Sequence, residues 1–235
     1  MKRLATTLRW EATLQARHHF YSVTAVVAIV WIGLVRLLPE AVRAYPASVI
    51  PFFVLVNLQI TAFYFSAALI LLERAQGITA ALLTSPLRPG EQLWVKTLSL
   101  TAVGTVENAV IVLFVFGPAT QWAWLLVGTA FLAALYVLLG AAVVARHTAL
   151  NSFLVPSVGW VTLCSLPLLS LFGLTPHWLF VWHPMTPPLL LLEASSRPMS
   201  LTLILSGAFG SAAWCAAVFF WARSRLTHIV APSAA

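Results

Sequence analysis

Residues that could carry out chemistry are scarce in this 235-residue chain, which has six Glu, no Asp, six His and two Cys. ATP hydrolysis requires a phosphate-binding G-x-x-x-x-G-K-[ST] loop, and neither of the two lysines, Lys2 and Lys96, follows a glycine. No H-E-x-x-H zinc motif is present, and Cys164 and Cys215 each stand alone in an apolar run. The sequence therefore predicts no catalytic residue, no metal site and no cofactor on this chain.

Glu107 is a carboxylate in the middle of an apolar run, next to Asn108. A charged group at the centre of a bilayer costs about 3 kcal/mol on insertion scales, so this side chain is expected to face protein or water. Two interpretations remain open. Glu107 either lines a substrate path or carries a proton, or it makes an interhelical hydrogen bond that stabilises the bundle.

Polar side chains also recur on one face of two other apolar runs. Asn57, Thr61 and Tyr64 are spaced i, i+4, i+7, and Ser157 and Trp160 share a face of a later run. A polar face within lipid has to point toward protein or water. These residues are candidates to line a substrate path, and ordinary helix–helix contact is the alternative.

The apolar runs that hold these residues dominate the composition. Hydrophobic types make up 61% and charged types 8% of the chain, mean hydropathy is +0.95, and soluble domains carry about 25% charged residues. This composition excludes a soluble globular enzyme, and the continuous, non-alternating runs argue against a β-barrel. The net charge of +7 is scattered between the runs, so it indicates membrane orientation and not nucleic-acid binding.

The predicted fold class is an all-α membrane protein with six transmembrane helices, because a helix needs roughly 20 apolar residues to cross the hydrocarbon layer. Six runs qualify: Tyr21–Leu38, Val49–Leu72, Thr97–Phe116, Trp122–Val144, Ser152–Gly173 and Leu201–Ala222. With both termini inside, the inside segments hold ten of the 13 Lys and Arg residues, as the positive-inside rule requires. We expect a multi-pass protein of the cell membrane with both termini in the cytoplasm.

The other segments complete one domain, without a repeat or a linker. Residues 1–20 are expected to form a helix in the membrane interface, although Glu11 and Gln15 interrupt its apolar side. Residues 174–200 are apolar and broken by prolines, which favours a pair of short re-entrant or interfacial helices. The predicted division is 1–20, 21–72 (two spans), 73–96 (long cytoplasmic loop), 97–173 (three spans), 174–200, 201–222 (last span) and 223–235 (cytoplasmic tail).

The long loop has the pattern of a short helix with an apolar face. Ile78, Ala81 and Leu82 are spaced i, i+3, i+4, and Pro86 ends the helical pattern. A short helix that holds an apolar face out in water needs a partner to cover that face. The alternative is a solvated turn whose apolar side rests on lipid headgroups.

The same loop resembles the signature of type-2 ABC exporter permeases. In that family the second span ends in Glu-Arg, followed by a Gly, a short helix, a Thr-x-Pro turn and a Lys that enters the third span. The chain departs from the family pattern at Ala80, where many members carry Glu. The matching residues are Glu73, Arg74, Gly77, Leu82, Leu83, Thr84, Pro86 and Lys96.

The resemblance covers the whole chain and is nearest to the permeases named as drug or fluoroquinolone exporters. It implies that the N-terminal helix is the family's elbow helix and that the loop contains the coupling helix, which fits a groove of a cytoplasmic ATPase subunit. The implied coupling residues are Glu73, Arg74, Gly77, Ile78, Ala81, Leu82, Thr84 and Pro86.

The implied function is that of the membrane-spanning subunit of an ATP-driven exporter of drugs, lipids or peptides. ATP and Mg would bind to the ATPase partner, and a second permease, identical or homologous, would complete the transporter within membrane lipid. The alternative is an ion- or proton-coupled secondary transporter that uses Glu107. Inverted repeats and broken helices, which such transporters often show, are not evident in the sequence.

Overall fold

The computed structural model describes residues 2–77, 89–118 and 120–230. The described residues form helices without any strand. The elements are α1 (Lys2–Arg17), α2 (Phe20–Arg36), α3 (Glu40–Arg43), α4 (Pro46–Leu58), the π-helix η1 (Gln59–Tyr64), α5 (Phe65–Ala75), α7 (Pro89–Phe116), α8 (Trp122–Val144), α9 (Leu150–Ser165), α10 (Leu168–Leu171), the 3-10 helix η2 (His177–Phe180), α11 (Thr186–Ala194) and α12 (Leu201–Val230).

Five segments of the described chain are long and apolar enough to cross a membrane: Pro46–Ala75, Gly90–Phe116, Trp122–Val144, Leu150–Leu171 and Leu201–Thr227. The sixth expected span is α2, whose 17 residues lie at the short end of the range of about 17–25 for a crossing helix. A bend of 64° separates α2 from α1. The prediction of an all-α membrane protein is therefore confirmed.

The predicted span boundaries agree best with the observed helix ends where the helix and the apolar run end together. The fourth span, Trp122–Val144, is α8 as predicted. The third helix already begins at Pro89 and the last continues to Val230, because backbone hydrogen bonds continue through polar residues beyond the apolar run.

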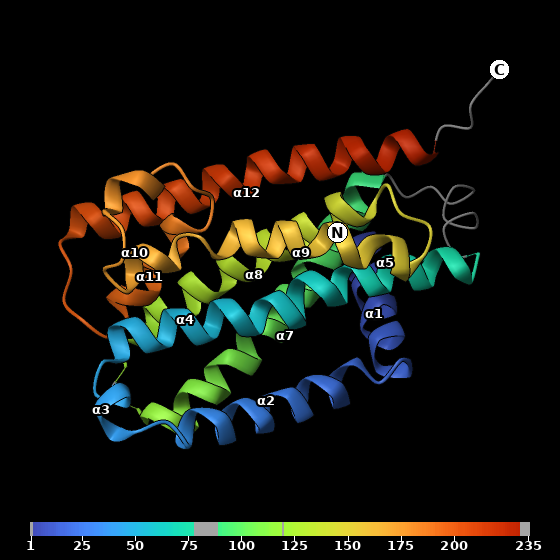
Figure 1. Ribbon diagram of the computed structural model, residues 1–235. Helices are drawn as coiled ribbons and strands as arrows, with labels where there is room; N and C mark the ends of the chain where they lie inside the picture. Colours follow the sequence, from blue (N-terminus) through green and yellow to red (C-terminus); the bar gives the residue numbers. More distant parts are fainter. Residues whose placement is uncertain (1, 78–88, 119, 231–235) are drawn as a thin grey trace.

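The α8 helix is the centre of the bundle. It packs against α7, α11, α12 and the span formed by α4, η1 and α5, and in Figure 1 it runs between α12 above and α2 below. In its apolar window 78% of the residues are buried, against 22% in the α9–α10 span and 22% in α12. The core therefore surrounds α8, whereas the fifth and sixth spans leave wide apolar surfaces uncovered.

A glycine permits the closest approach of α8 to its neighbours. A Cβ atom on Gly140 would overlap the Phe63 carbonyl and Ser66 Oγ of the adjoining span. The Phe63 carbonyl accepts a hydrogen bond from Ser66 Oγ at 2.9 Å. Gly140 thus sets the distance between α8 and the π-helix η1.

The apolar segment between the fifth and sixth spans contains the short helices η2 and α11. Seven of the nine α11 residues are buried, among them Pro187 and Glu193, and α11 packs on α8 and α12. A Cβ on Gly207 of α12 would lie 3.1 Å from the Pro187 carbonyl, so the small residue is needed for this contact. α11 is therefore part of the folded core.

Candidate functional site

A buried ionic cluster joins α1 to α5 and α7, the two helices that precede and follow residues 78–88. Lys96 Nζ of α7 donates to Glu73 Oε1 of α5 at 2.6 Å and to Glu11 Oε1 of α1 at 2.8 Å. All three residues are at most 7% exposed. We call Glu11, Glu73 and Lys96 the ion cluster. Burial makes it energetically sensitive, because removing one member of a buried ion pair costs about 3–5 kcal/mol.

The polar residues that interrupt the apolar side of α1 are the residues that dock it. Besides Glu11, Gln15 is fully buried, and its Oε1 accepts hydrogen bonds from Ser99 Oγ at 3.1 Å and from Tyr21 OH at 3.3 Å. Leu14 is buried as well, whereas Leu8 is 39% exposed. The helix therefore turns the face that carries Glu11, Leu14 and Gln15 inward, toward α7.

Arg74 points to a different helix from its neighbour Glu73. Its Nη1 donates to the backbone carbonyls of His147 at 2.7 Å, Ala145 at 3.3 Å and Val144 at 3.5 Å. These carbonyls lie at the C-terminus of α8, where backbone acceptors lack intrahelical partners and the helix dipole favours a cation. Arg74 thus fixes the end of α5 to the end of the central helix.

Gly77 is the last described residue before the loop. Its φ of +70° is a left-handed conformation that glycine adopts at little cost, and it closes the C-terminus of the helix. Its N–H donates to the Arg74 carbonyl at 3.1 Å. The coupling residues Ile78, Ala81, Leu82, Thr84 and Pro86, with Leu83, lie outside the described residues, so their role stays a prediction.

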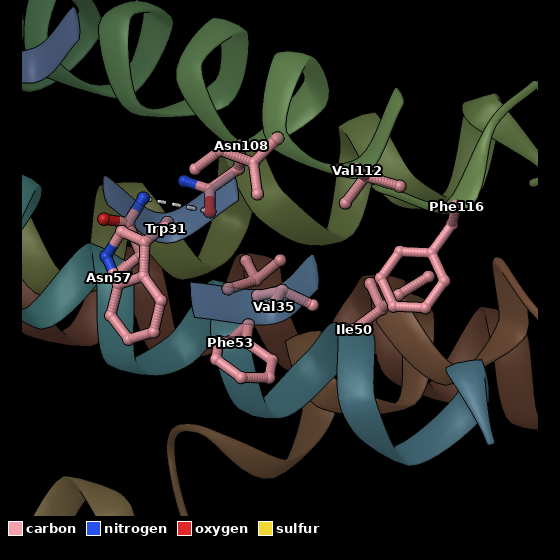
Figure 2. Close-up of a pocket in the computed structure, with 10 residues that line it drawn as sticks. Trp31, Val35, Ile50, Phe53, Asn57, Asn108, Val112 and Phe116 are labelled. Atoms are coloured by element: carbon pink, nitrogen blue, oxygen red, sulfur yellow. Dashed lines mark hydrogen bonds between the residues drawn. The ribbon is translucent and has the colours of Figure 1, made fainter. Parts of the chain in front are cut away.

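A second set of buried polar side chains lies between α4 and α7 in the middle of the bundle. Asn57 Nδ2 donates to Asn108 Oδ1 at 3.1 Å (Figure 2), and Asn108 Nδ2 donates to the Gly104 carbonyl at 2.8 Å. Thr61 Oγ1 donates back to the Asn57 carbonyl at 3.2 Å. The interhelical hydrogen bond at this level is therefore made by Asn108 and not by Glu107.

Glu107 is 4% exposed and lies beside this hydrogen bond. Asn57 and Thr61 are the polar side chains that approach its carboxyl group, but their donors are directed to Asn108 and to the helix backbone. Both Glu107 carboxyl oxygens and Asn57 Oδ1 consequently have no hydrogen-bond partner. Glu107 is thus a buried carboxyl group to which no described side chain donates a hydrogen bond of good geometry.

The predicted polar face of the second span is divided by the π-helix η1. Tyr64 OH accepts a hydrogen bond from Ser157 Oγ of α9 at 3.2 Å, away from Asn57 and Thr61. The i→i+5 hydrogen bonds of a π-turn widen the turn, so Tyr64, at the end of the π-helix, leaves the face that α-helical spacing predicts. Trp160, the remaining candidate, contacts Trp221 of α12 with ring centroids 5.6 Å apart.

The sequence reasoning missed Gln59 as a member of a buried polar network. Its Nε2 donates to Ser165 Oγ at 2.7 Å and to Tyr136 OH at 3.1 Å, which joins the second, fourth and fifth spans. Polar residues on two faces of the second span were the available signal. A span with two polar faces is surrounded by protein, and 72% of its apolar window is buried.

A small cavity adjoins the Asn57–Asn108 pair. Figure 2 shows it extending from this pair toward Phe116, between α2, α4 and α7, and it has room for about one water molecule. Its other lining residues are apolar or aromatic: Trp31, Val35, Ile50, Phe53, Val54, Ile111, Val112 and Phe116.

His183 precedes α11 at the opposite end of the bundle from the ion cluster. Its Nδ1 accepts a hydrogen bond from the Met185 N–H at 3.2 Å, which favours the neutral imidazole. Burial lowers the pKa of His183, partly offset by a backbone hydrogen bond at Leu163. In the described part of the chain, no three His, Cys, Asp or Glu residues gather as a metal site would require.

Comparison with known proteins finds one family model over nearly the whole chain. Residues 2–232 match the model of the fluoroquinolones export permease protein family. Two proteins named fluoroquinolones export permease protein, from two strains of Mycobacterium tuberculosis, are each 27% identical over 202 residues. The match covers 86% of this chain and 84% of each relative.

Proposed function

Because the chain belongs to the fluoroquinolones export permease protein family, we propose that it is the membrane-spanning subunit of an ATP-driven exporter. ATP would bind and be hydrolysed on a separate subunit, with Mg. The substrate would be a drug, lipid or peptide moved outward across the cell membrane. Fluoroquinolone-like drugs are the first candidates, since that is what the two relatives are named for.

The observation that carries this proposal is the ion cluster. Lys96 holds α1, α5 and α7 together at both ends of the loop that contains the proposed coupling helix. Arg74 links the same place to the C-terminus of α8. A push on the loop by an ATPase subunit would therefore move the elbow helix, the second and third spans and the central helix together.

The proposed transporter contains two permeases and two ATPase subunits, with both termini of this chain in the cytoplasm. The apolar surfaces of the fifth and sixth spans support a further membrane partner. Val155 is 81% exposed and Val158 61% exposed in α9, and Phe209 is 73% exposed in α12. Lipid or a second permease has to cover these side chains in the membrane.

The decisive experiment is purification of the full chain in mild detergent, followed by transport in reconstituted vesicles. We expect an ATPase to co-purify and outward transport of a fluoroquinolone to require both ATP and that subunit. The mass of the complex gives the number of permeases. Transport that needs no ATPase and follows an imposed proton or ion gradient would contradict the proposal and favour the alternative transporter that uses Glu107.

A further inference from the structure

The α1 helix crosses one end of the bundle. It is turned by 64° from α2, and His19 between the two helices has a φ of +58°. In Figure 1, α1 runs across the direction of the long helices, at the end of the bundle away from α3. A helix turned this far from a membrane-spanning neighbour runs closer to the plane of the membrane than to its normal. The geometry therefore allows one side of α1 to lie along the lipid headgroups.

The two sides of α1 carry opposite charges. Glu11, the only carboxylate of the helix, is buried and paired with Lys96. Arg9, Thr13 and Arg17 are exposed and spaced i, i+4, i+8 on the side away from Glu11. Within the described residues, no carboxylate forms an ion pair with either arginine. The outer face of α1 is therefore a basic surface that the protein itself does not neutralise.

The composition of this segment fits a phospholipid surface. Four cations precede α2 in the chain: Lys2, Arg3, Arg9 and Arg17. Clusters of about this size beside a transmembrane helix are attracted to the anionic lipids of the cytoplasmic leaflet. Trp10 is 41% exposed, and tryptophan is enriched at the level of the headgroups. Charge and aromatic content thus both favour a lipid headgroup as the partner of this face.

We propose that the outer face of α1 binds anionic phospholipid headgroups of the cytoplasmic leaflet through Arg9 and Arg17. A guanidinium group fits a phosphate with two parallel hydrogen bonds. At about 1.5 Å per residue, the two arginines are about 12 Å apart along the helix, so each binds the headgroup of a separate lipid. The inference goes beyond the proposed export function. It shares with that function only the cytoplasmic position of α1, and it needs neither an ATPase nor an exported substrate.

Lipid bound on this face would act on the ion cluster through the same helix. The Glu11 carboxylate, two residues from Arg9, accepts a hydrogen bond from Lys96 Nζ at 2.8 Å. Gln15, two residues before Arg17, is fully buried on the same inner side. Lipid that holds the outer face in the headgroup layer therefore also holds α1 against α7. A ligand that binds only this docked state stabilises the folded protein.

The test is a titration of the purified full chain in mild detergent with phosphatidylglycerol or with phosphatidylcholine of the same chain length. Native mass spectrometry resolves the bound lipids and gives the two affinities. Attraction of an anionic lipid surface is worth about 5-fold in affinity for each Lys or Arg, and about 30-fold for two. We expect phosphatidylglycerol to bind about 30-fold more tightly than phosphatidylcholine, and this preference to fall when salt is raised. Phosphatidylglycerol should also raise the midpoint of thermal unfolding more than phosphatidylcholine does.

Paired arginine variants locate the site. Arg9→Gln together with Arg17→Gln should weaken binding of phosphatidylglycerol about 30-fold and leave binding of phosphatidylcholine unchanged. The matched control is Arg146→Gln together with Arg223→Gln, which removes the same charge from two exposed arginines of other segments and should keep the lipid preference. Arg9→Lys together with Arg17→Lys keeps both charges and should retain most of the affinity.

Equal affinity for the two lipids, or an unchanged affinity of the glutamine pair for phosphatidylglycerol, would overturn the inference. An equal loss in the control pair would show an effect of net charge without a site, and an equal loss in the lysine pair would show that charge is not recognised, so either result overturns it. Displacement of the lipid by inorganic phosphate would show an adventitious ion only and would also overturn it.

These results are separable from the test of the proposed function. A glutamine pair that binds lipid normally but no longer co-purifies with an ATPase would show that the outer face of α1 docks on a protein, which overturns the lipid site and leaves the exporter standing. A lipid preference that requires Arg9 and Arg17, in a protein whose transport needs no ATPase, would support the lipid site and contradict the ATP-driven exporter.

Discussion

Lys96 is the one cation of the ion cluster, and it lies between two buried carboxylates. No other member of the cluster could neutralise these carboxylates if Lys96 were lost. Its ammonium group is the donor in both hydrogen bonds of the ion cluster. Leu93 and Leu100 of the same helix are buried as well. The stability of this end of the bundle therefore depends on the balance of three side chains more than on any one contact.

Replacement of Lys96 by Met should lower the free energy of unfolding by about 3–5 kcal/mol, because it leaves two carboxylates unpaired in a buried site. The triple variant Lys96→Met with Glu11→Gln and Glu73→Gln should recover much of this loss, since it removes all three charges. Thermal unfolding monitored by size-exclusion chromatography measures both effects. Glu40→Gln, on a side chain 96% exposed in a weak pair with Arg43, should change nothing.

Gly140 gives a second test at a single position. Gly140→Ala would place a methyl group against Ser66 and the Phe63 carbonyl, and overpacking of this kind costs about 1–3 kcal/mol. Gly159→Ala is the matched control, because no atom lies within 4 Å of a Cβ at Gly159. Thermal unfolding of the two variants should separate them, and equal midpoints would show that α8 and η1 can move apart freely.

At the level of helices, the arrangement around the loop links α1, α5, α7 and α8 through side chains and not through a continuous backbone. Two adjacent residues at the end of α5 bind two different helices. Glu73 binds Lys96 of α7, and Arg74 binds the carbonyls at the end of α8. The π-helix in the same span turns Gln59 toward Tyr136 and Ser165, so one span contacts the third, fourth and fifth spans in succession.

Loss of this linkage should uncouple transport from ATP hydrolysis. Coupling free energies of about 1–3 kcal/mol correspond to roughly 5- to 150-fold, so Glu73→Ala should reduce transport within that range while the partner still hydrolyses ATP. Leu82→Asp, in the loop outside the described residues, should do the same by disrupting the proposed apolar contact. The measurement is the ratio of substrate moved to ATP hydrolysed in vesicles.

The control for uncoupling is Glu40→Ala, in the exposed helix α3. It should leave both rates unchanged. Full transport by correctly folded Glu73→Ala and Leu82→Asp variants would contradict the coupling role assigned to this end of the bundle.

Taken as a whole, the molecule leaves much of its fifth and sixth spans uncovered. The apolar window of the α9–α10 span is 22% buried; its main contacts are α8 and the short helix η2, although its candidate residue Ser157 is fully buried. The opposite face of α9 is apolar and exposed at Val155 and Val158. A second permease on this face would enclose a path that one chain cannot enclose.

Cysteine cross-linking tests this arrangement. Val155→Cys should form a dimer with a short bifunctional thiol reagent in native membranes, because the proposed second permease covers this face. Ile29→Cys, 69% exposed on α2, serves as the comparison and should cross-link less. Cys164 and Cys215 are replaced by Ala in both variants. Stronger cross-linking through Ile29→Cys would place the second permease, if present, on α2.

Composition and periodicity were sufficient for the helical membrane fold and for most of the span positions, because lipid requires long apolar helices whatever their neighbours. The loop signature that begins at Glu73 and Arg74 was sufficient for the family, and the match over residues 2–232 confirms it. Local sequence did not show that Glu11 and Gln15 are the docking face of α1, because their partners Lys96 and Ser99 are far away in the chain.

Only the packing of the helices shows that the candidate polar residues lie at separate sites in the bundle. Tyr64 leaves the face of Asn57 and Thr61 because η1 is a π-helix, and a wider turn is not visible in residue spacing. Asn108 takes the interhelical hydrogen bond and leaves Glu107 without a donor. Which of two adjacent side chains reaches the neighbouring helix depends on how the helices are rotated against each other, and that is determined by the whole bundle around α8.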